Sequence, residues 1–277
     1  MSRAVVLSDG ADILVLGGLA RGDVSTAAVE RINPATGAGT RAGSLALAVH
    51  DAAGALLGGR SLVFGGGSST TVPTVQAFTG QTATTVGRLP EPRSDVAAVV
   101  VGNRAYVLGG FDGTRLVPSV VGTTDGVTFT SAGQLAQPVR YPAVAVEGGY
   151  VWVIGGDLGT AENATTGGQT TDIQRFDPAS GTTTVVGHLP NPLGHAAAVV
   201  FGHQLFVVGG RSGTAPSAQI WRVDTATGTV TNAGSLPGPR SDAGIVTVGG
   251  VAWMLGGELT SSASPLNTVV ELRPGTS

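Results

Sequence analysis

Short apolar runs that end in a glycine pair recur along the chain. Six such runs occur: ILVLGG, SLVFGG, AYVLGG, VWVIGG, LFVVGG and AWMLGG. The first glycines of the pairs are Gly17, Gly65, Gly109, Gly155, Gly209 and Gly256, so the period lies between 44 and 54 residues. A period of this length is typical of repeat proteins that use one small unit of structure per repeat.

Two other markers recur in phase with the glycine pairs. Segments such as LPEPRSDVAAVV (residues 89–100) precede the later pairs, and turns such as DPASG (residues 177–181) follow several of them. Asp-Pro and Thr-Gly steps favour turns, so each of these turns joins two strands. In the third repeat the pattern predicts strands over Val96–Val101, Ala105–Leu108, Pro118–Thr123 and Thr128–Ala132.

The first two strands of each repeat are apolar throughout instead of alternating. Such strands are buried on both faces, as they are when four-stranded blades stack against one another. The sequence therefore predicts an all-β fold, a six-bladed β-propeller in a single domain over residues 1–277. The predicted blades cover residues 1–45, 46–89, 90–135, 136–189, 190–236 and 237–277. No helix longer than about two turns is expected.

Composition excludes several classes of function. The formal net charge is −3, charged residues make up 12% of the chain, and all fifteen basic residues are arginines scattered along it. This distribution argues against nucleic-acid binding. No apolar run approaches the roughly 20 residues that span a bilayer, and no secretory signal begins the sequence. The absence of cysteine excludes disulfides and thiolate chemistry. Low charge with many Ser, Thr and Gly residues is a compositional hint of an extracellular or cell-surface protein.

The order of the markers resembles the kelch repeat over essentially the whole chain. An apolar run, Gly-Gly, a strand ending in Asp-Pro-x-x-Gly, and then Leu-Pro-x-Pro-Arg follow one another as in that family. The tryptophan that the family carries in the fourth strand is missing from every repeat. The resemblance implies the propeller fold, and it implies that ligands bind on the face shared by the d–a and b–c loops, where a to d are the strands of a blade from first to last. It does not imply the function of any particular member.

Aligned turns between blades give the candidate residues for one mouth of the central channel. Positions that are equivalent in the repeats form a ring, and three arginines stand in or beside the same turns. The candidates are Arg3, Asp51, Arg93, Asp95, Arg140, Tyr141, His195, Arg240 and Asp242, with Pro142 as the alternative to Tyr141 in the fourth blade.

Two interpretations of this ring are open. In the first, Arg93, Arg140 and Arg240 present guanidinium groups to a carboxylate or a sugar. In the second, the Arg and Asp side chains join the blades by satisfying backbone groups of the loops. Asp51, Asp95 and Asp242 could also surround a hard cation, but bound water is the simpler filler and we predict no metal.

The b–c loops contribute a second set of candidates on the same face. These are Arg21, Asp23, Asp112, Arg115, Asp157, Arg211 and Glu258. The alternative is that they are solvated loop residues.

No catalytic motif is present in the sequence. We find no GxSxG in a strand–turn–helix context, no HExxH and no phosphate loop. The resemblance suggests two enzyme classes. Copper radical oxidases need a cysteine, which this chain lacks. A sugar mutarotase needs one acid and one base, which His195 with Asp242 or Asp95 could supply.

The leading hypothesis is therefore a non-catalytic binding module for a small molecule, glycan or peptide. Its expected partners are a protein, a peptide or a carbohydrate, without cofactor, nucleic acid or membrane insertion. The alternatives are a mutarotase-like sugar enzyme, or a structural or sensory ectodomain of a larger protein.

The last predicted blade has one strand too few. Gly-x-Leu ends the fourth strand five times, at Leu45, Leu89, Leu135, Leu189 and Leu236, although there are six glycine pairs. The resemblance suggests that a strand from the other end of the chain often closes such rings. We therefore expect the chain to be a piece of a longer protein whose missing strand preceded Met1, and we expect the third strand of the last blade to be an open edge. A natural three-stranded blade is the alternative.

Overall fold

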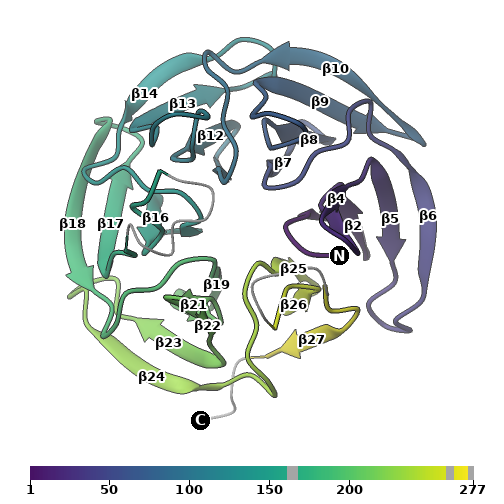
Figure 1. Ribbon diagram of the computed structural model, residues 1–277. Coiled ribbons are helices and arrows are strands. Elements are labelled where there is room, and N and C mark those ends of the chain that lie inside the picture. Colours follow the sequence, from purple (N-terminus) through teal and green to yellow (C-terminus); the bar gives the residue numbers. More distant parts are fainter. Residues whose placement is uncertain (161–167, 260–264, 274–277) are drawn as a thin grey trace.

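The fold consists of strands arranged in a ring around a central opening (Figure 1). The computed structural model describes residues 1–160, 168–259 and 265–273. Within these ranges the chain forms strands, turns and loops and contains no helix, and no helix that could cross a membrane is found there. The prediction of an all-β chain is therefore confirmed for the described residues.

The strands form successive antiparallel meanders. The first contains β1 (Val5–Asp9), β2 (Asp12–Leu16), β5 (Ala28–Ile32) and β6 (Gly39–Ser44). The second contains β7 (Ala53–Leu57), β8 (Arg60–Phe64), β9 (Thr74–Thr79) and β10 (Thr82–Arg88); the third contains β11 (Ala97–Val101), β12 (Arg104–Leu108), β13 (Ser119–Thr123) and β14 (Thr130–Gln134). The fourth contains β15 (Ala143–Glu147), β16 (Tyr150–Ile154), β17 (Asp172–Asp177) and β18 (Thr182–His188). The fifth contains β19 (Ala197–Phe201), β20 (Gln204–Val208), β23 (Gln219–Val223) and β24 (Val230–Ser235).

The sixth meander is shorter within the described residues. It contains β25 (Gly244–Val248), β26 (Val251–Leu255) and β27 (Val269–Leu272), and β27 pairs only with β26. Residues 274–277, which follow β27 and Arg273, lie outside the described residues. Two short hairpins, β3 (Leu19–Ala20) with β4 (Val24–Ser25) and β21 (Arg211–Ser212) with β22 (Ala215–Pro216), lie in b–c loops.

The strands predicted for the third repeat match β11 to β14 to within one or two residues. The differences lie at strand ends, where turn residues join the ladder. The last strands β6, β10, β14, β18 and β24 form the rim of the ring, and the first strands line its centre (Figure 1).

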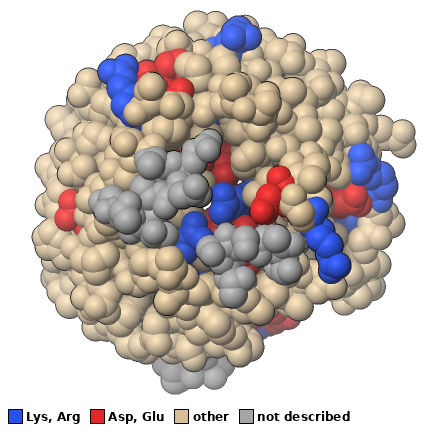
Figure 2. Space-filling view, viewed as in Figure 1, with Lys and Arg blue, Asp and Glu red and all other residues tan. Residues whose placement is uncertain are grey.

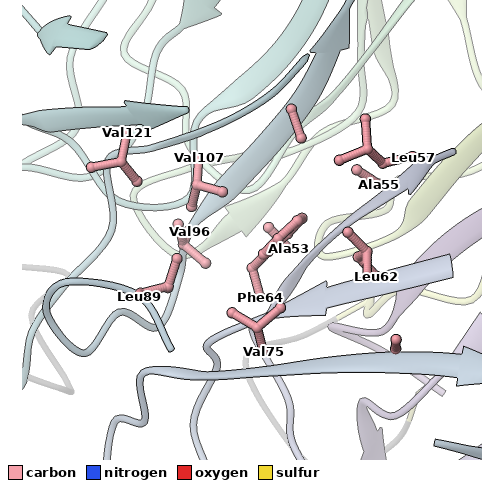
Figure 3. Close-up of a cluster of buried hydrophobic side chains, with 12 residues drawn as sticks. Ala53, Ala55, Leu57, Leu62, Phe64, Val75, Leu89, Val96, Val107 and Val121 are labelled. Atoms are coloured by element: carbon pink, nitrogen blue, oxygen red, sulfur yellow. The ribbon is translucent and has the colours of Figure 1, made fainter. Parts of the chain in front are cut away.

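Apolar side chains from neighbouring meanders pack between the sheets. Figure 3 shows one such layer, in which Leu62 and Phe64 of β8 face Val107 of β12, and all three are fully buried. Burial on both faces explains why the first two strands of each repeat are continuously apolar. Each glycine pair adopts positive φ at both residues, as expected where the chain leaves the second strand in a tight turn.

Candidate functional site

One residue from the entry turn of each meander faces the centre of one end of the channel. These residues are Arg3, Asp51, Asp95, Tyr141, His195 and Asp242, and we call them the mouth ring. The six φ angles lie between 52° and 57°, a left-handed conformation that is uncommon outside glycine. Because Tyr141 and not Pro142 has this conformation, Tyr141 is the member from the fourth meander.

Backbone hydrogen bonds join the mouth ring into a closed circle. Each N–H donates to the carbonyl oxygen of the preceding member, over 2.8–3.1 Å, and the circle closes where the N–H of Arg3 donates to the oxygen of Asp242. The backbone thus places six side chains at one mouth with nearly equal geometry.

A second ring lies beside the first. The residue after each glycine pair forms a β-bridge with the residue before a mouth-ring member. These second-ring residues are Leu19, Gly67, Phe111, Asp157, Arg211 and Glu258. The first three meanders therefore contribute apolar residues to the second ring, and the last three contribute charged ones. In Figure 2 acidic and basic side chains gather around the hollow at the centre of this face.

His195 is held between two carboxylates. Its Nδ1 lies 2.6 Å from Oδ1 of Asp242, and its Nε2 lies 3.1 Å from Oδ2 of Asp157. Burial acts to lower the pKa of His195, but the two carboxylates outweigh it and raise that pKa. The same ion pair lowers the pKa of Asp242 against the opposing effect of its own burial. Both ring nitrogens of His195 thus face carboxylate oxygens, which favours the protonated form of the imidazole.

Arg3 and Tyr141 meet across the channel. Nη1 of Arg3 lies 3.3 Å from the Tyr141 hydroxyl, which in turn donates to Oδ2 of Asp51 over 3.1 Å. Arg3 also contacts Glu258, at 3.3 Å. Burial, together with the charges of Asp51 and Asp95, raises the pKa of Tyr141 well above its usual range, so the phenol keeps its proton.

Asp95 is the carboxylate whose protonation changes near neutral pH. It is buried, and Nη1 of Arg140 lies 3.3 Å from its Oδ2. Burial and the neighbouring charge of Asp51 raise the pKa of Asp95 to about 7, although Arg140 acts in the opposite direction. Burial and the charge of Asp242 likewise raise the pKa of Glu258.

Arg211 lies over the face of the His195 ring. One of its nitrogens, Nη2, is 3.1 Å from Nδ1 and 2.8 Å from Nε2 of His195. A single atom so close to both ring nitrogens cannot lie along both N–H directions, so the contact is a stack and not a pair of hydrogen bonds. The Tyr141 ring stacks on the same imidazole with centroids 3.9 Å apart.

The donors of Arg211 are largely unused within the described part of the chain. The nearest carboxylate oxygen, Oδ2 of Asp242, is 3.8 Å from Nη1, which is too far for a hydrogen bond. The Arg211 side chain is only 12% exposed. A largely buried guanidinium therefore lies beside the mouth, and no oxygen of the described residues accepts a hydrogen bond from it.

A cavity of about 130 Å³ lies against the mouth ring. Its wall consists of the ring members and the residue that follows each of them: Ala4, Ala52, Val96, Pro142, Ala196 and Ala243. Small apolar residues thus continue the channel inward from the polar mouth.

Two of the three candidate arginines, Arg93 and Arg240, are held by hydrogen bonds within the chain. The side chain of Arg93 is fully buried and donates to the backbone oxygen of Ser119 at 2.8 Å and to Glu91 at 3.0 Å. Arg240 donates to the carbonyl oxygen of Gly256 and to Oγ1 of Thr268. Both guanidinium groups thus satisfy backbone carbonyls elsewhere in the chain, which is the arrangement that the second interpretation describes. Arg140 remains at the mouth, beside Asp95.

Replacing Arg93 by methionine is expected to destabilise the fold by about 3 kcal/mol, because a buried carbonyl and a carboxylate lose their donors. Chemical denaturation measures the loss. Arg115→Met is the matched control, since the Arg115 side chain is 72% exposed; that change is expected to cost less than about 0.5 kcal/mol. Similar losses in both variants would contradict the structural role of Arg93.

The other loop candidates divide into two groups. Asp157, Arg211 and Glu258 join the mouth, as described above. Arg21, Asp23 and Arg115 are exposed, and the structure does not bring them to the mouth ring. Asp112 accepts hydrogen bonds from the backbone of Thr114 and Arg115 and so stabilises its own turn. Burial acts to raise the pKa of Asp112, but these hydrogen bonds together outweigh it and lower that pKa to about 2.

The carboxylates of the mouth ring do not form a cation site in the described ranges, where no cluster suited to a metal is found. Asp51 faces Arg3, Asp95 faces Arg140, and Asp242 faces His195. Each carboxylate thus has its own positively charged partner, which leaves no set of oxygens free to converge.

Sequence reasoning missed one contributor: the Ser241 hydroxyl, which donates to Asp242 at 2.7 Å. Ser241 directly precedes the aligned residue Asp242 in the sequence, and this position could have identified it.

Comparisons with known proteins agree with this architecture. The kelch motif matches residues 92–121 and 192–237. Among 597 matching chains of solved structures, one entitled "Structure of YjhT" shares 14% sequence identity with a TM-score of 0.83, covering 99% of this chain and 95% of its own. At that identity the likeness shows the fold alone. No curated protein sequence matches. The two matched segments and the shared fold support the resemblance to kelch-repeat β-propellers.

Proposed function

We propose that this chain is a non-catalytic binding module whose mouth takes a small molecule, glycan or peptide through a carboxylate or similar anionic group. The observation that carries the proposal is Arg211, whose guanidinium is mostly buried, stacked on His195 and without a hydrogen-bonded oxygen from the described residues. A planar guanidinium binds a carboxylate with two parallel hydrogen bonds.

The surroundings of Arg211 favour such a ligand. His195 and Tyr141 form a rigid stack beneath the guanidinium, so little side-chain entropy would be lost on binding. Arg3 is the partly exposed cation of the mouth ring, at 19% side-chain exposure, whereas Asp51 and Asp242 are 5% and 2% exposed. In the second ring, Arg211 and Asp157 have similar side-chain exposures of 12% and 10%. A ligand that approaches the mouth ring from solvent therefore meets the guanidinium of Arg3 before it meets Asp51 or Asp242.

The mutarotase alternative receives less support from the same geometry. An acid–base catalyst needs an atom that can exchange a proton with the substrate. Both nitrogens of His195 already face carboxylates, and the imidazole is 1% exposed. Asp95, the other partner considered, is buried beside Arg140.

We further propose six blades. The closed circle of six backbone hydrogen bonds supports this count, because each bond joins the entry turns of neighbouring meanders. The same six turns supply the residues of the cavity wall.

Arg211→Gln is expected to weaken binding of carboxylate ligands at least tenfold, since a charge-assisted bidentate pair contributes more than about 1.4 kcal/mol. Calorimetry with uronic acids, sialylated glycans and acidic peptides, each beside an uncharged counterpart, measures the effect. Arg115→Gln, on an exposed loop, is the control. Preference for the uncharged counterparts, or equal losses in the two variants, would rule out Arg211 as the anchor.

A further inference from the structure

The seam between the first and sixth meanders contains an apolar cavity of about 130 Å³. Its wall includes Val15 and Ile32 of the first meander and Leu255, Gly256 and Val269 of the sixth. Val269 is 42% exposed, and its strand β27 pairs on one side only within the described residues. The seam is thus an apolar groove beside an open strand edge.

The other five meanders fill the equivalent place with a leucine. Leu45, Leu89, Leu135, Leu189 and Leu236 follow the last strand of each and are 4–5% exposed. A methyl carbon of each lies 3.2–3.6 Å from where a Cβ would stand on the first glycine of the same repeat. At Gly256 the nearest atoms are the carbonyl oxygens of Met1 and Leu266, and no described leucine side chain takes the sixth position.

One backbone carbonyl at the seam lacks, among the described residues, the hydrogen-bond donor that its equivalents have. In each complete meander the N–H of that leucine donates, over 2.7–2.8 Å, to the carbonyl just before the third strand: that of Ala27, Pro73, Pro118, Thr171 or Ala218. The N–H of Gly256 bonds to the oxygen of Thr268 as that of Gly17 bonds to Ala28, so Asn267 is the sixth equivalent of Ala27. Among the described residues, no backbone amide donates to Asn267.

A turn on the opposite side of the seam is also uncovered. Gly181 and Gly228 occupy equivalent turns of the fourth and fifth meanders, and a Cβ there would stand 2.6 Å and 1.9 Å from the oxygens of Ala132 and Val186 in the preceding meander. Gly37 is their equivalent in the first meander, and a Cβ there would meet nothing within 4 Å. The uncovered region therefore runs from Gly256 to Gly37, which is the path of a last strand.

We propose that the seam binds an extended Gly-x-Leu segment supplied by another polypeptide chain. The segment pairs with β27, its leucine enters the cavity against Gly256, and the leucine N–H donates to Asn267. Its glycine lies against Gly37, because the corresponding glycines of the complete meanders leave no space for a side chain: a Cβ on Gly133 or Gly187 would stand 2.2 Å or 2.4 Å from a turn oxygen. Strand addition of this kind combines main-chain hydrogen bonds with one side-chain pocket.

The test uses a peptide of residues 182–190, TTTVVGHLP, added to the whole chain. This segment is the chain's own last strand of the fourth meander with its glycine and leucine. We expect a saturable rise in Tm, and slower hydrogen exchange at the amides of β27, because a ligand that binds only the folded state stabilises it.

Two altered peptides serve as controls, and neither can disturb folding of the protein. The peptide with Leu189→Ala is expected to bind at least tenfold more weakly, and the peptide with Gly187→Val to lose binding. The proposal is overturned if the unaltered peptide has no effect at millimolar concentration, if both altered peptides act equally well, or if protection appears away from β27. The seam cavity touches Arg3 and Asp242 of the mouth ring but not Arg211, so Arg211→Gln is expected to leave peptide binding unchanged.

Discussion

Gly155→Ala is expected to destabilise the protein by more than about 4 kcal/mol, a large fraction of the roughly 5–15 kcal/mol by which folded proteins are stable. Gly155 is the first glycine of the fourth pair and has a φ of +61°. A Cβ there would stand 2.1 Å from the carbonyl oxygen of Leu193 in the next entry turn. That oxygen accepts a hydrogen bond from Gly156 and cannot move away without breaking it. Backbone strain and a clash with fixed backbone therefore add together.

A second glycine separates these two causes. Gly149 lies in the turn before β16, has a φ of +80°, and would meet nothing within 4 Å if it carried a Cβ. Gly149→Ala is expected to cost about 1 kcal/mol, from backbone strain alone. Urea denaturation of both variants measures the difference. Equal losses of unfolding free energy in the two variants would contradict a role for the close approach between Gly155 and the Leu193 oxygen.

Asp95→Asn is expected to stabilise the protein at pH 8 by roughly 2–4 kcal/mol and to leave its stability at pH 4 nearly unchanged. Burial and the charge of Asp51 raise the pKa of Asp95 to about 7 in the folded state, above the value near 4 of the unfolded chain. A carboxyl group whose pKa is raised by folding stabilises the folded state at a pH below its pKa in the unfolded chain. This contribution is lost as the pH rises through the folded pKa of about 7. The amide cannot ionise and so avoids that loss.

Asp112→Asn is the control, because the contribution of Asp112 to stability depends on pH in the opposite direction. Hydrogen bonds from its own turn lower the pKa of Asp112 to about 2, so its contribution is present above the unfolded value and is lost as the pH falls. Denaturation curves between pH 4 and pH 8 compare each variant with the wild-type chain. A constant difference between Asp95→Asn and wild type across this range would contradict a raised pKa at Asp95.

The repeat made the outline of the fold predictable. Periodic apolar runs, glycine pairs and turn residues are local signals, and local backbone preferences largely decide where strands begin and end. Alignment of the repeats also placed Arg3, Asp51, Asp95, His195 and Asp242 together, because residues at equivalent positions of a closed ring lie at the same height. Tyr141 needed the structure, since an adjacent proline made the alignment of the fourth repeat ambiguous.

The directions of the long side chains were decided only by tertiary structure. Arg93 and Arg240 occupy the same turns as the mouth ring, yet their guanidinium groups donate to the carbonyl oxygens of Ser119 and Gly256. Arg211 is one loop residue among seven in the sequence, and only folding brings it over His195, where no oxygen of the described residues accepts a hydrogen bond from it. The sequence by itself determined the all-β architecture, the repeat and the positions that face the mouth, because these depend on short-range patterns. The tertiary structure decided which charged groups pair with one another and which donors and cavities stay open, because pairing depends on neighbours far apart in the chain.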